Sequence, residues 1–376
     1  MIKVDILNKS EEAKYEKFLL KCDYSSCQSS LEWSKTITAL GKDEPYFLIA
    51  KKNDAIVGAL PLYYYKCKQG NLLTSIAFHT ISGITCIKNS YNEVFKALVD
   101  YSLDLGKELD CVAVSFNTNP FSHGHNFCID NFKPDYIMEN FVQYIRLNEI
   151  FDEKGNVIHP NYLRRTNLSR TLRRIKRKPL LISEEQTESN VEAGYKIHEK
   201  RSRELGATPI PRELFDSALR NLTTKGKGQF LFAFYNGKMI SECLFLYSRT
   251  TIDMFMMSMD SDYKRLGTNY RFTDYILRWA YDHGISVLSW MSAPRKNDGV
   301  YRWKQQFGSH EATFYYLTKI IGDITPWKKM SYRELSEVYK FHYLLPFNLL
   351  KGSGAKYTTK DELTSFCNLF TNQRSP

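Results

Sequence analysis

A lysine between aromatic side chains is the first candidate for chemistry. Lys304 lies in the segment GVYRWKQQFG, next to Trp303 and close to Tyr301 and Phe307. An ammonium group in an aromatic setting can orient a phosphate or carboxylate, or stabilise negative charge that develops in a transition state. The alternative is an exposed lysine whose alkyl stem packs on the rings. The segment is predicted to be a polar, aromatic loop.

Two carboxylates are candidates for a general base. Glu242 shares one face of a predicted strand, Met239–Tyr247, with Leu244 and Leu246. A carboxylate on an apolar face is unfavourable unless it is paired, and burial moves its pKa toward that of a base. A structural ion pair or an edge-strand position is the alternative. Asp260, at the end of the next strand, is the second candidate.

A basic glycine turn separates that strand from a predicted helix, Asn269–Gly284. Its residues are Lys264, Arg265, Leu266, Gly267, Thr268 and Asn269. The first N–H groups of a helix have no acceptor within the helix, so such a turn suits a phosphate or pyrophosphate. An ordinary strand-to-helix turn is the alternative.

A second basic segment, Asn161–Lys178, is predicted to be a helix. Leu168, Leu172 and Ile175 recur on one helical face. The remainder carries eight cations and no acid, which favours an anionic partner over a solvated face. These cations are Arg164, Arg165, Arg170, Arg173, Arg174, Lys176, Arg177 and Lys178.

Composition limits the class of protein. The chain has 376 residues, enough for two domains, and its net charge of +11 favours a nucleotide, a tRNA, an anionic lipid or a phosphate-bearing precursor as partner. No apolar run is long enough to span a bilayer and no signal peptide is evident, so we expect a cytoplasmic protein. The eight cysteines show no zinc-binding spacing, and we expect no metal.

The chain contains an internal repeat with a shift of about 183 residues. Tyr46–Tyr64 and Gln229–Tyr247 both read as a strand, an Asn-Asp or Asn-Gly turn and a second strand, which is the pattern of a β-hairpin. A helix and a further strand follow each hairpin. A duplicated α/β domain explains this pattern, and a chance likeness of two hairpins is the alternative. We predict domains at 1–147 and 148–322, followed by a helical, aromatic and basic tail at 323–376.

Several short motifs resemble the FemAB-like branch of the GNAT-type acyltransferases, including the BioF-like acetyltransferases. The most specific is a G-x-Y-x-[FW]-K-x-x-[FW]-G element, matched by Gly299–Gly308; the weaker ones are matched by Gln28–Trp33, Gly58–Leu62, Leu163–Lys178 and Arg203–Gly206. The resemblance implies an α/β fold of mixed α+β character. It also implies two tandem GNAT-like domains, each with a twisted, mostly antiparallel sheet flanked by helices.

The resemblance further implies transfer of an acyl group to a primary amine of a cell-envelope, amino-sugar or peptide acceptor. An acyl-CoA co-substrate is favoured over an aminoacyl-tRNA, and no permanently bound cofactor is expected. The catalytic candidates are then Lys304, Tyr301, Glu242 and Asp260. The donor contacts are Lys264, Arg265, Gly267, Thr268 and Asn269, and the acceptor contacts are Arg164, Arg165, Arg170, Arg203, Trp33 and Arg302.

Two alternatives to this function stay open. One is an aminoacyltransferase of the peptidoglycan-bridge type that uses aminoacyl-tRNA. The other is a non-catalytic protein that binds nucleic acid or an anionic membrane through the basic segment Arg164–Lys178 and the aromatic tail. In the second case a peripheral contact with the inner face of the membrane is expected.

Overall fold

Most of the predicted strands form mostly antiparallel sheets. These sheets belong to two units, which are built from different parts of the chain. In the computed structural model, unit 1 comprises Met1–Phe141 and Thr313–Cys367, and unit 2 comprises Val142–Ala312 and Asn368–Pro376. The structure describes residues 2–41, 43–79, 81–87, 91–121, 124–163, 165–292, 296, 298–340, 342, 357 and 358.

The sheet of unit 1 has the strand order β1-β2-β3-β4-β6-β13, in which β4 and β6 run parallel and the other neighbours antiparallel. Its strands are β1 (Lys3–Ile6), β2 (Asp43–Lys52), β3 (Ala55–Tyr65), β4 (Asn71–Thr74), β5 (Thr85–Cys86), β6 (Cys111–Asn117), β13 (His310–Ile320) and β14 (Tyr357–Thr358). Its helices are α1 (Glu12–Leu19), α2 (Leu31–Thr38), α3 (Tyr91–Glu108), α4 (His125–Phe132), α11 (Thr325–Lys328) and α12 (Tyr332–Val338).

The sheet of unit 2 has the order β7-β12-β11-β10-β9-β8, with β11 and β12 parallel. Its strands are β8 (Leu180–Ser183), β9 (Gly228–Tyr235), β10 (Lys238–Tyr247), β11 (Thr251–Met259), β12 (Val287–Ser292) and the second part of β7 (Tyr136–Arg146). Its helices are α5 (Leu147–Ile150), α6 (Asn167–Lys176), α7 (Glu188–Glu204), α8 (Arg212–Asn221), α9 (Thr268–Asp282) and α10 (Gly299–Gln305).

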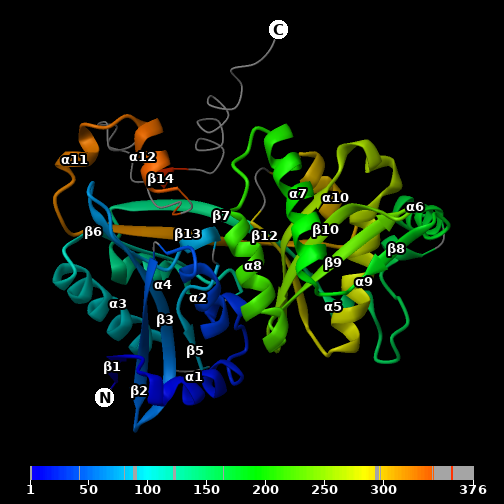
Figure 1. The fold of residues 1–376 in the computed structure, drawn as a ribbon. Helices are drawn as coiled ribbons and strands as arrows, with labels where there is room; N and C mark the ends of the chain where they lie inside the picture. Colours follow the sequence, from blue (N-terminus) through cyan, green and yellow to red (C-terminus); the bar gives the residue numbers. More distant parts are fainter. Residues whose placement is uncertain are drawn as a thin grey trace. The chain divides into compact units, whose positions relative to one another are not determined.

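The two units repeat one arrangement, which agrees with the predicted duplication and confirms the fold class (Figure 1). Each has a hairpin, β2–β3 or β9–β10, followed by a strand, a helix and a parallel strand. The hairpin turns place Asn53 and Asp54 at φ of 50° and 60°, and Asn236 and Gly237 at 49° and 78°. Positive φ at both central residues is the geometry that Asn-Asp and Asn-Gly turns favour.

The sheet of unit 2 is apolar on both faces. On one face Cys243 and Phe245 of β10 join a core with Phe272 and Ile276 of α9. On the other face Glu242 lies under α7, because a Cβ on Gly194 would be 3.2 Å from the Cβ of Glu242. Alternation along the strand therefore directs Glu242 toward α7, away from the core that α9 covers.

The structure differs from the sequence expectations at three places. The predicted second domain, 148–322, includes residues 313–322, but β13 pairs with β6 of unit 1, where Tyr316 lies opposite Asn117. The predicted loop around Lys304 is the helix α10, because Asp298 caps it by accepting the N–H of Tyr301 at 2.6 Å. The helix predicted at 161–178 begins only after its N-cap Thr166.

The part of the tail that the structure describes packs into unit 1. Trp327 and Tyr339 are buried, and the indole N–H of Trp327 donates to the Tyr339 hydroxyl at 2.8 Å. That hydroxyl donates to the carbonyl of Gly70 at 2.9 Å. Buried rings cannot enter a membrane surface, so these two aromatics do not support the expected membrane contact. Of the other tail aromatics, Phe341, Tyr343, Phe347, Phe366 and Phe370 lie outside the described residues.

Candidate functional site

Lys304 is a buried cation at the end of β12. Its ammonium donates to the carbonyl oxygen of Trp290 at 3.2 Å and lies 5.9 Å from the centre of the Trp290 ring. Burial lowers the pKa of Lys304 to about 8, although the negative charge of Asp298 acts against this shift. A lysine with such a pKa can both donate and accept a proton near neutral pH.

Tyr301 lies on the same face of α10 as Lys304, one helical turn earlier. Its hydroxyl is hydrogen-bonded to Glu311 and accepts a bond from the amide of Gln305 at 3.1 Å. The bond to Glu311, together with burial, raises the pKa of Tyr301 to about 12. Tyr301 therefore stays protonated at neutral pH and can act as a hydrogen-bond donor.

The backbone is irregular near the end of β12, where its pairing with β7 shifts register between Ser289 and Ser292. Met291 has a φ of 58°, which is rare for a residue with a side chain, and its N–H donates to the Ser289 hydroxyl at 3.1 Å. The ring of the intervening residue, Trp290, contacts Trp303 of α10 with 5.1 Å between ring centres. Such strained positions cluster at functional sites.

The parallel strands β11 and β12 are paired over only three residues. The pairing covers Thr251–Asp253 and Val287–Ser289, whereas β11 continues to Met259. Beyond Asp253, the described residues of β12 do not pair with this edge of β11. The backbone N–H and C=O groups there are suited to an extended ligand that lies along the strand.

Asp253, at the last paired position, is a site residue that the sequence reasoning missed. It is buried opposite Ser289, and its Oδ2 has no hydrogen-bond partner among the described residues. Burial raises the pKa of Asp253 to about 7, while a hydrogen bond from Ser289 acts in the opposite direction. The available signal was an acid near the start of the apolar segment IDMFMMSMD, whose last residue is Asp260.

Glu242 lies on an apolar face of β10, as the sequence pattern predicts. It is fully buried, and burial raises its pKa to about 8. Ser258, its partner across the β10–β11 pair, acts against this rise, yet neither Glu242 oxygen has a hydrogen bond of normal geometry among the described residues. A buried carboxylate without a partner binds a proton strongly, which suits a general base.

Asp260 is the weaker candidate for a base. Its carboxylate lies 2.8 Å from the ammonium of Lys200 and 3.4 Å from that of Lys238, and it accepts the N–H of Asp262. Although burial acts against it, hydrogen bonding to these lysines lowers the pKa of Asp260. A carboxylate held ionised in this way accepts a proton poorly.

The basic turn lies at the start of α9, as predicted. Gly267 has a φ of +71°, and a Cβ on it would lie 2.6 Å from Cδ1 of Ile175. Glycine is therefore required here both by the backbone conformation and by the neighbouring helix α6. Thr268, the first residue of α9, is buried, and its hydroxyl has no hydrogen-bond partner among the described residues. Lys264 and Arg265 are exposed, and Asn269 is half-buried.

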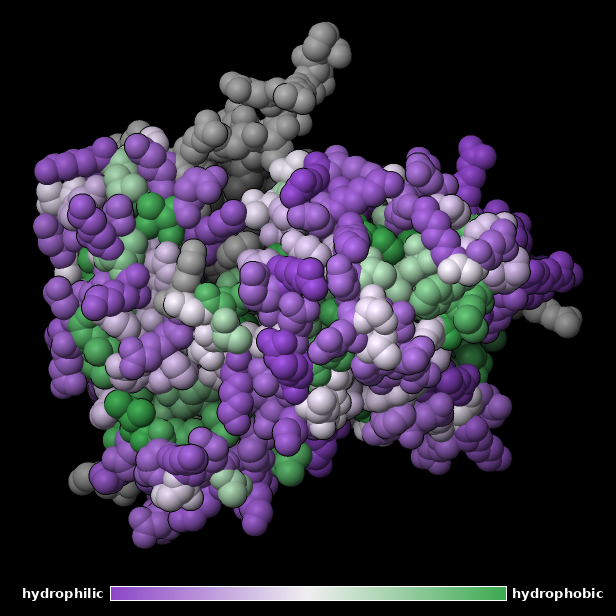
Figure 2. Space-filling model, in the orientation of Figure 1, coloured by the Kyte–Doolittle hydropathy of each residue, from purple (hydrophilic) through white to green (hydrophobic). Residues whose placement is uncertain are grey.

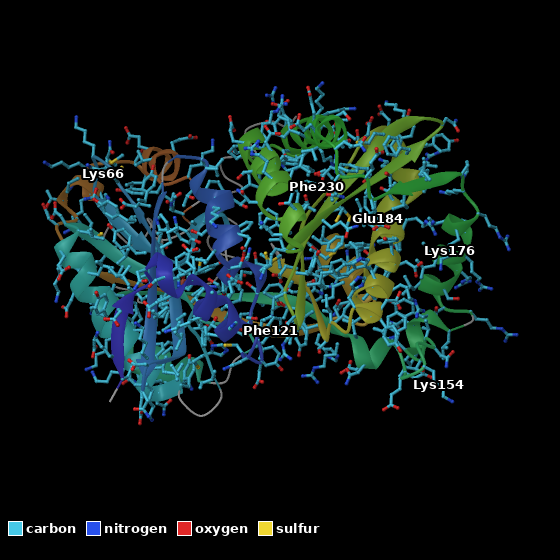
Figure 3. The ribbon with its side chains drawn as sticks, turned by 60° about the horizontal axis from the view of Figure 1, so that its bottom comes forward. Lys66, Phe121, Lys154, Lys176, Glu184 and Phe230 are labelled. Atoms are coloured by element: carbon cyan, nitrogen blue, oxygen red, sulfur yellow. The ribbon has the colours of Figure 1, made fainter. Side chains whose placement is uncertain are left out.

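The basic helix α6 packs beside this turn. The ammonium of Lys178 is hydrogen-bonded to the carbonyl of Arg265, and Lys176 forms an ion pair with Asp274 of α9 at 2.9 Å. Figure 2 shows hydrophilic side chains standing out over α6, and Figure 3 shows Lys176 on this helix beside α9. Two cations of the basic segment, Lys176 and Lys178, therefore lie next to α9 and the predicted donor turn.

The other predicted acceptor contacts are scattered. Arg165 and Arg170 are exposed next to the start of α6, and Arg203 is exposed on α7 in an ion pair with Glu199 at 2.7 Å. Arg302 is exposed on α10. Trp33 is completely buried in unit 1, so it offers no surface to an acceptor. Arg164 lies outside the described residues.

Two features are absent from the part of the chain that the structure describes. No cluster of three or more His, Cys, Asp and Glu side chains there has the arrangement of a metal site. Among the described helices, none combines the length and the apolar character needed to cross a bilayer.

Comparisons with known proteins agree with this description. Residues 163–305 match the model of the Acetyltransferase (GNAT) domain. The fold is similar to that of FemX (10% identity, TM-score 0.67, covering 89% of this chain and 99% of that one). It is also similar to a tandem GNAT protein from the clavulanic acid biosynthesis pathway (9% identity, TM-score 0.51, covering 86% of this chain and 100% of that one).

A third similar structure is the C-terminal domain of a putative lysylphosphatidylglycerol synthetase from Agrobacterium fabrum (10% identity, TM-score 0.53, covering 83% of this chain and 92% of that one). No curated protein matches the chain in sequence. At these identities the structural likeness concerns the fold. The matched GNAT domain contains α6, the basic turn, the β11–β12 opening and Lys304.

Proposed function

We propose that this chain, which carries a GNAT acetyltransferase domain over residues 163–305 and has the fold of the FemAB-like branch, is an N-acyltransferase. The reaction is transfer of an acyl group from a donor, preferably an acyl-CoA, to a primary amine, with formation of an amide. Unit 2 is the proposed catalytic unit.

The observation that carries this proposal is the opening between β11 and β12 next to the basic turn. An acyl-CoA has an extended arm with two amide groups, which suits the backbone groups that β11 offers beyond Asp253. Its pyrophosphate suits the N-terminus of α9 at Gly267–Asn269, with Lys264, Arg265 and the cations of α6 around it. A single region of unit 2 thus supports both parts of the donor.

The chemistry follows from the groups near this opening. The acceptor amine attacks the thioester carbonyl, a C–N bond forms, the C–S bond breaks, and backbone N–H groups of β11 stabilise the oxyanion. Glu242, with its raised pKa, takes the proton of the amine. Lys304 or Tyr301 orients the acceptor or gives a proton to the departing thiolate.

The acceptor is proposed to be a primary amine of a cell-envelope precursor, an amino sugar or a peptide. The exposed Arg302, on α10 beside Lys304, and Arg203 on α7 are the acceptor contacts that we retain. The place of action is proposed to be the cytoplasm.

The first experiment is a calorimetric titration of the whole protein with CoA at low and moderate salt, followed by mass spectrometry of amines incubated with acetyl-CoA. Saturable CoA binding that survives added salt and an acetylated amine support the proposal. Absence of CoA binding, together with transfer from aminoacyl-tRNA, would assign the alternative donor to the basic turn and the cations next to it. Salt-sensitive binding of nucleic acid without transfer would identify a binding protein instead.

A further inference from the structure

The burial of Glu242 creates a problem for its role as a base. The side chain has no exposed surface, so an acceptor amine cannot touch the carboxylate in this structure. A proton can still reach it through an intervening group that exchanges one proton for another. Such a carrier has to contact Glu242 on one side and remain accessible on the other.

Ser258 of β11 has this position. It lies directly opposite Glu242 in the register of the β10–β11 pair and retains 7% of its surface exposed. It belongs to the part of β11 that continues past the paired residues Thr251–Asp253. Its hydroxyl lies 3.1 Å from Nδ1 of His198, a residue of α7 that is also 7% exposed.

Hydrogen bonds around His198 determine which atom donates in the hydrogen bond between His198 and Ser258. Nε2 of His198 accepts the backbone N–H of Ile210 at 3.1 Å and lies 3.4 Å from the Ser202 hydroxyl. Because Nε2 is an acceptor, the proton of the neutral ring sits on Nδ1 and is donated to the Ser258 hydroxyl. Burial lowers the pKa of His198 to about 4, so the ring is neutral at physiological pH.

The Ser258 hydroxyl, which accepts from His198, can then turn its own proton only toward another acceptor. The carboxylate of Glu242 is the neighbouring group, since its Oε1 lies 4.0 Å from the same Nδ1 and has no hydrogen-bond partner among the described residues. One lone pair of the Ser258 oxygen is left for a ligand. Rotation of the Glu242 side chain would complete the bond between them.

We propose that Ser258 is a catalytic residue that relays the proton of the acceptor amine to Glu242, and that His198 is the residue that positions Ser258. The inference rests on the proposed function. As the amine attacks the thioester, its N–H bond breaks and its proton binds the Ser258 oxygen. The original hydroxyl proton of Ser258 moves to Glu242, and the serine is neutral before and after the step.

The surroundings of Glu242 leave few other routes for the proton. From β9 the neighbour is Phe232, from α7 they are Gly194 and His198, and from β11 it is Ser258. His198 is thus the titratable group that faces Glu242 among the described residues. Glu199, the charged residue that acts on His198, lies next to it on α7.

The test uses the full chain with acetyl-CoA and an amine that the wild type acetylates. Ser258→Ala removes the relay and is expected to lower kcat by about 10²-fold, whereas Ser258→Thr keeps the hydroxyl and restores most of it. His198→Asn keeps a donor near the Nδ1 position and His198→Gln near the Nε2 position, so only His198→Asn should retain activity. Ser241→Ala is the matched control, because the Ser241 hydroxyl is also buried and donates a hydrogen bond to the backbone carbonyl of Ser258 at 2.6 Å.

The pH profile separates a relay from a purely structural role. In the wild type, ionisation of Glu242 should contribute to the rise of kcat/KM toward alkaline pH. This contribution should be absent from the profiles of Ser258→Ala and Glu242→Gln, while Ser241→Ala keeps the wild-type profile. Loss of activity in Glu242→Gln with an unchanged profile in Ser258→Ala would overturn the relay and leave the proposed function intact. Full activity in Glu242→Gln would overturn the base itself.

A second measurement does not depend on finding a substrate. Nitrogen-15 NMR of the histidine rings, with His198 assigned by its loss in His198→Asn, reports which ring nitrogen carries the proton. The relay requires protonation of Nδ1 and a changed Nδ1 shift in Ser258→Ala. Protonation of Nε2 would overturn the proposal even if acyl transfer is demonstrated, and an inactive wild type would overturn the proposed function separately.

Discussion

The ammonium of Lys304 donates to the carbonyl of Trp290 at 3.2 Å, and this bond joins α10 to the end of β12. The carbonyl precedes Met291, whose φ of 58° changes the direction of the strand. A lysine that holds a backbone group at such a place contributes both charge and geometry.

Replacement of Lys304 should abolish most of the turnover. We expect Lys304→Ala and Lys304→Met to lower kcat by about 10²-fold or more, because both lose the charge that stabilises the transition state. Lys154→Met, at an exposed position in the loop before α6, is the control for loss of a positive charge. Steady-state kinetics with acetyl-CoA, together with thermal unfolding, measures both effects. Full activity of Lys304→Ala in a folded protein would remove α10 from the site.

The two buried acids should make stability depend on pH. Burial raises the pKa of Glu242 from 4.5 to about 8 and that of Asp253 from 3.8 to about 7. The folded state therefore binds more protons than the unfolded state in this window, so their stabilising contribution is complete below the unfolded values and is lost as the pH rises toward 7 and 8. The loss is on the order of 2–4 kcal/mol for each acid.

Urea unfolding between pH 5 and 8 checks this prediction. Glu242→Gln and Asp253→Asn should each flatten the decline of the unfolding free energy with pH. Glu184→Gln, at an exposed position of unit 2 that Figure 3 labels, should leave the slope as it is in the wild type. A slope that is unaltered in both buried variants would contradict the raised pKa values.

Gly267 can be tested against a second glycine of the same backbone conformation. Gly267 and Gly237 have φ of +71° and +78°, but a Cβ would contact Ile175 only at Gly267 and would meet nothing within 4 Å at Gly237. We expect Gly237→Ala to cost about 1 kcal/mol of stability and Gly267→Ala about 3 kcal/mol, since the latter adds a steric clash. Only Gly267→Ala should also weaken CoA binding.

Chemical denaturation and calorimetry measure these two effects. The double variant Gly267→Ala with Ile175→Ala should regain part of the CoA affinity, because it removes the side chain that clashes. Equal affinity of Gly267→Ala and the wild type for CoA would place the donor elsewhere.

The cations of α6 are expected to contribute to donor affinity. Burial and the charge of Arg174 lower the pKa of Lys178. A bound anion would reduce the repulsion between these two positive charges. Arg174→Gln and Lys178→Met should each raise the Kd for CoA about tenfold, which corresponds to 1.4 kcal/mol. Added salt should reduce this difference.

Lys154 provides the control for this charge effect. It is exposed in the loop before α6 and is marked in Figure 3. Lys154→Met removes one positive charge from unit 2 without touching α6, so its Kd should equal that of the wild type. If all three variants bind CoA equally well, α6 would have another partner.

The sequence allowed the prediction of local features that depend on neighbouring residues. The Asn-Asp and Asn-Gly turns are found at positive φ, and Leu168, Leu172 and Ile175 are buried together on α6. The further strand predicted after the second hairpin and its helix is β12 (Val287–Ser292). In each case spacing along the chain determines the structure, because the interacting residues are close in sequence.

Contacts between distant residues could not be predicted. His198 and Ser258 are 60 residues apart, and neither lies in a pattern that points to the other. Asp253 looked like one polar residue in an apolar strand until its pairing with Ser289 was known. Lys304 was placed in a loop because glycine and aromatic residues obscured the cap supplied by Asp298.

The position of β13 in the sequence affects how the protein folds during synthesis. Unit 1 receives β13 from residues beyond 312, whereas unit 2 takes its residues mainly from the middle of the chain. A ribosome therefore completes the segment Val142–Ala312 before it has produced the strand that pairs with β6. Unit 2 is the first that can close during synthesis, and truncations after residue 147 or 312 would leave the edge of β6 uncovered and prone to aggregation.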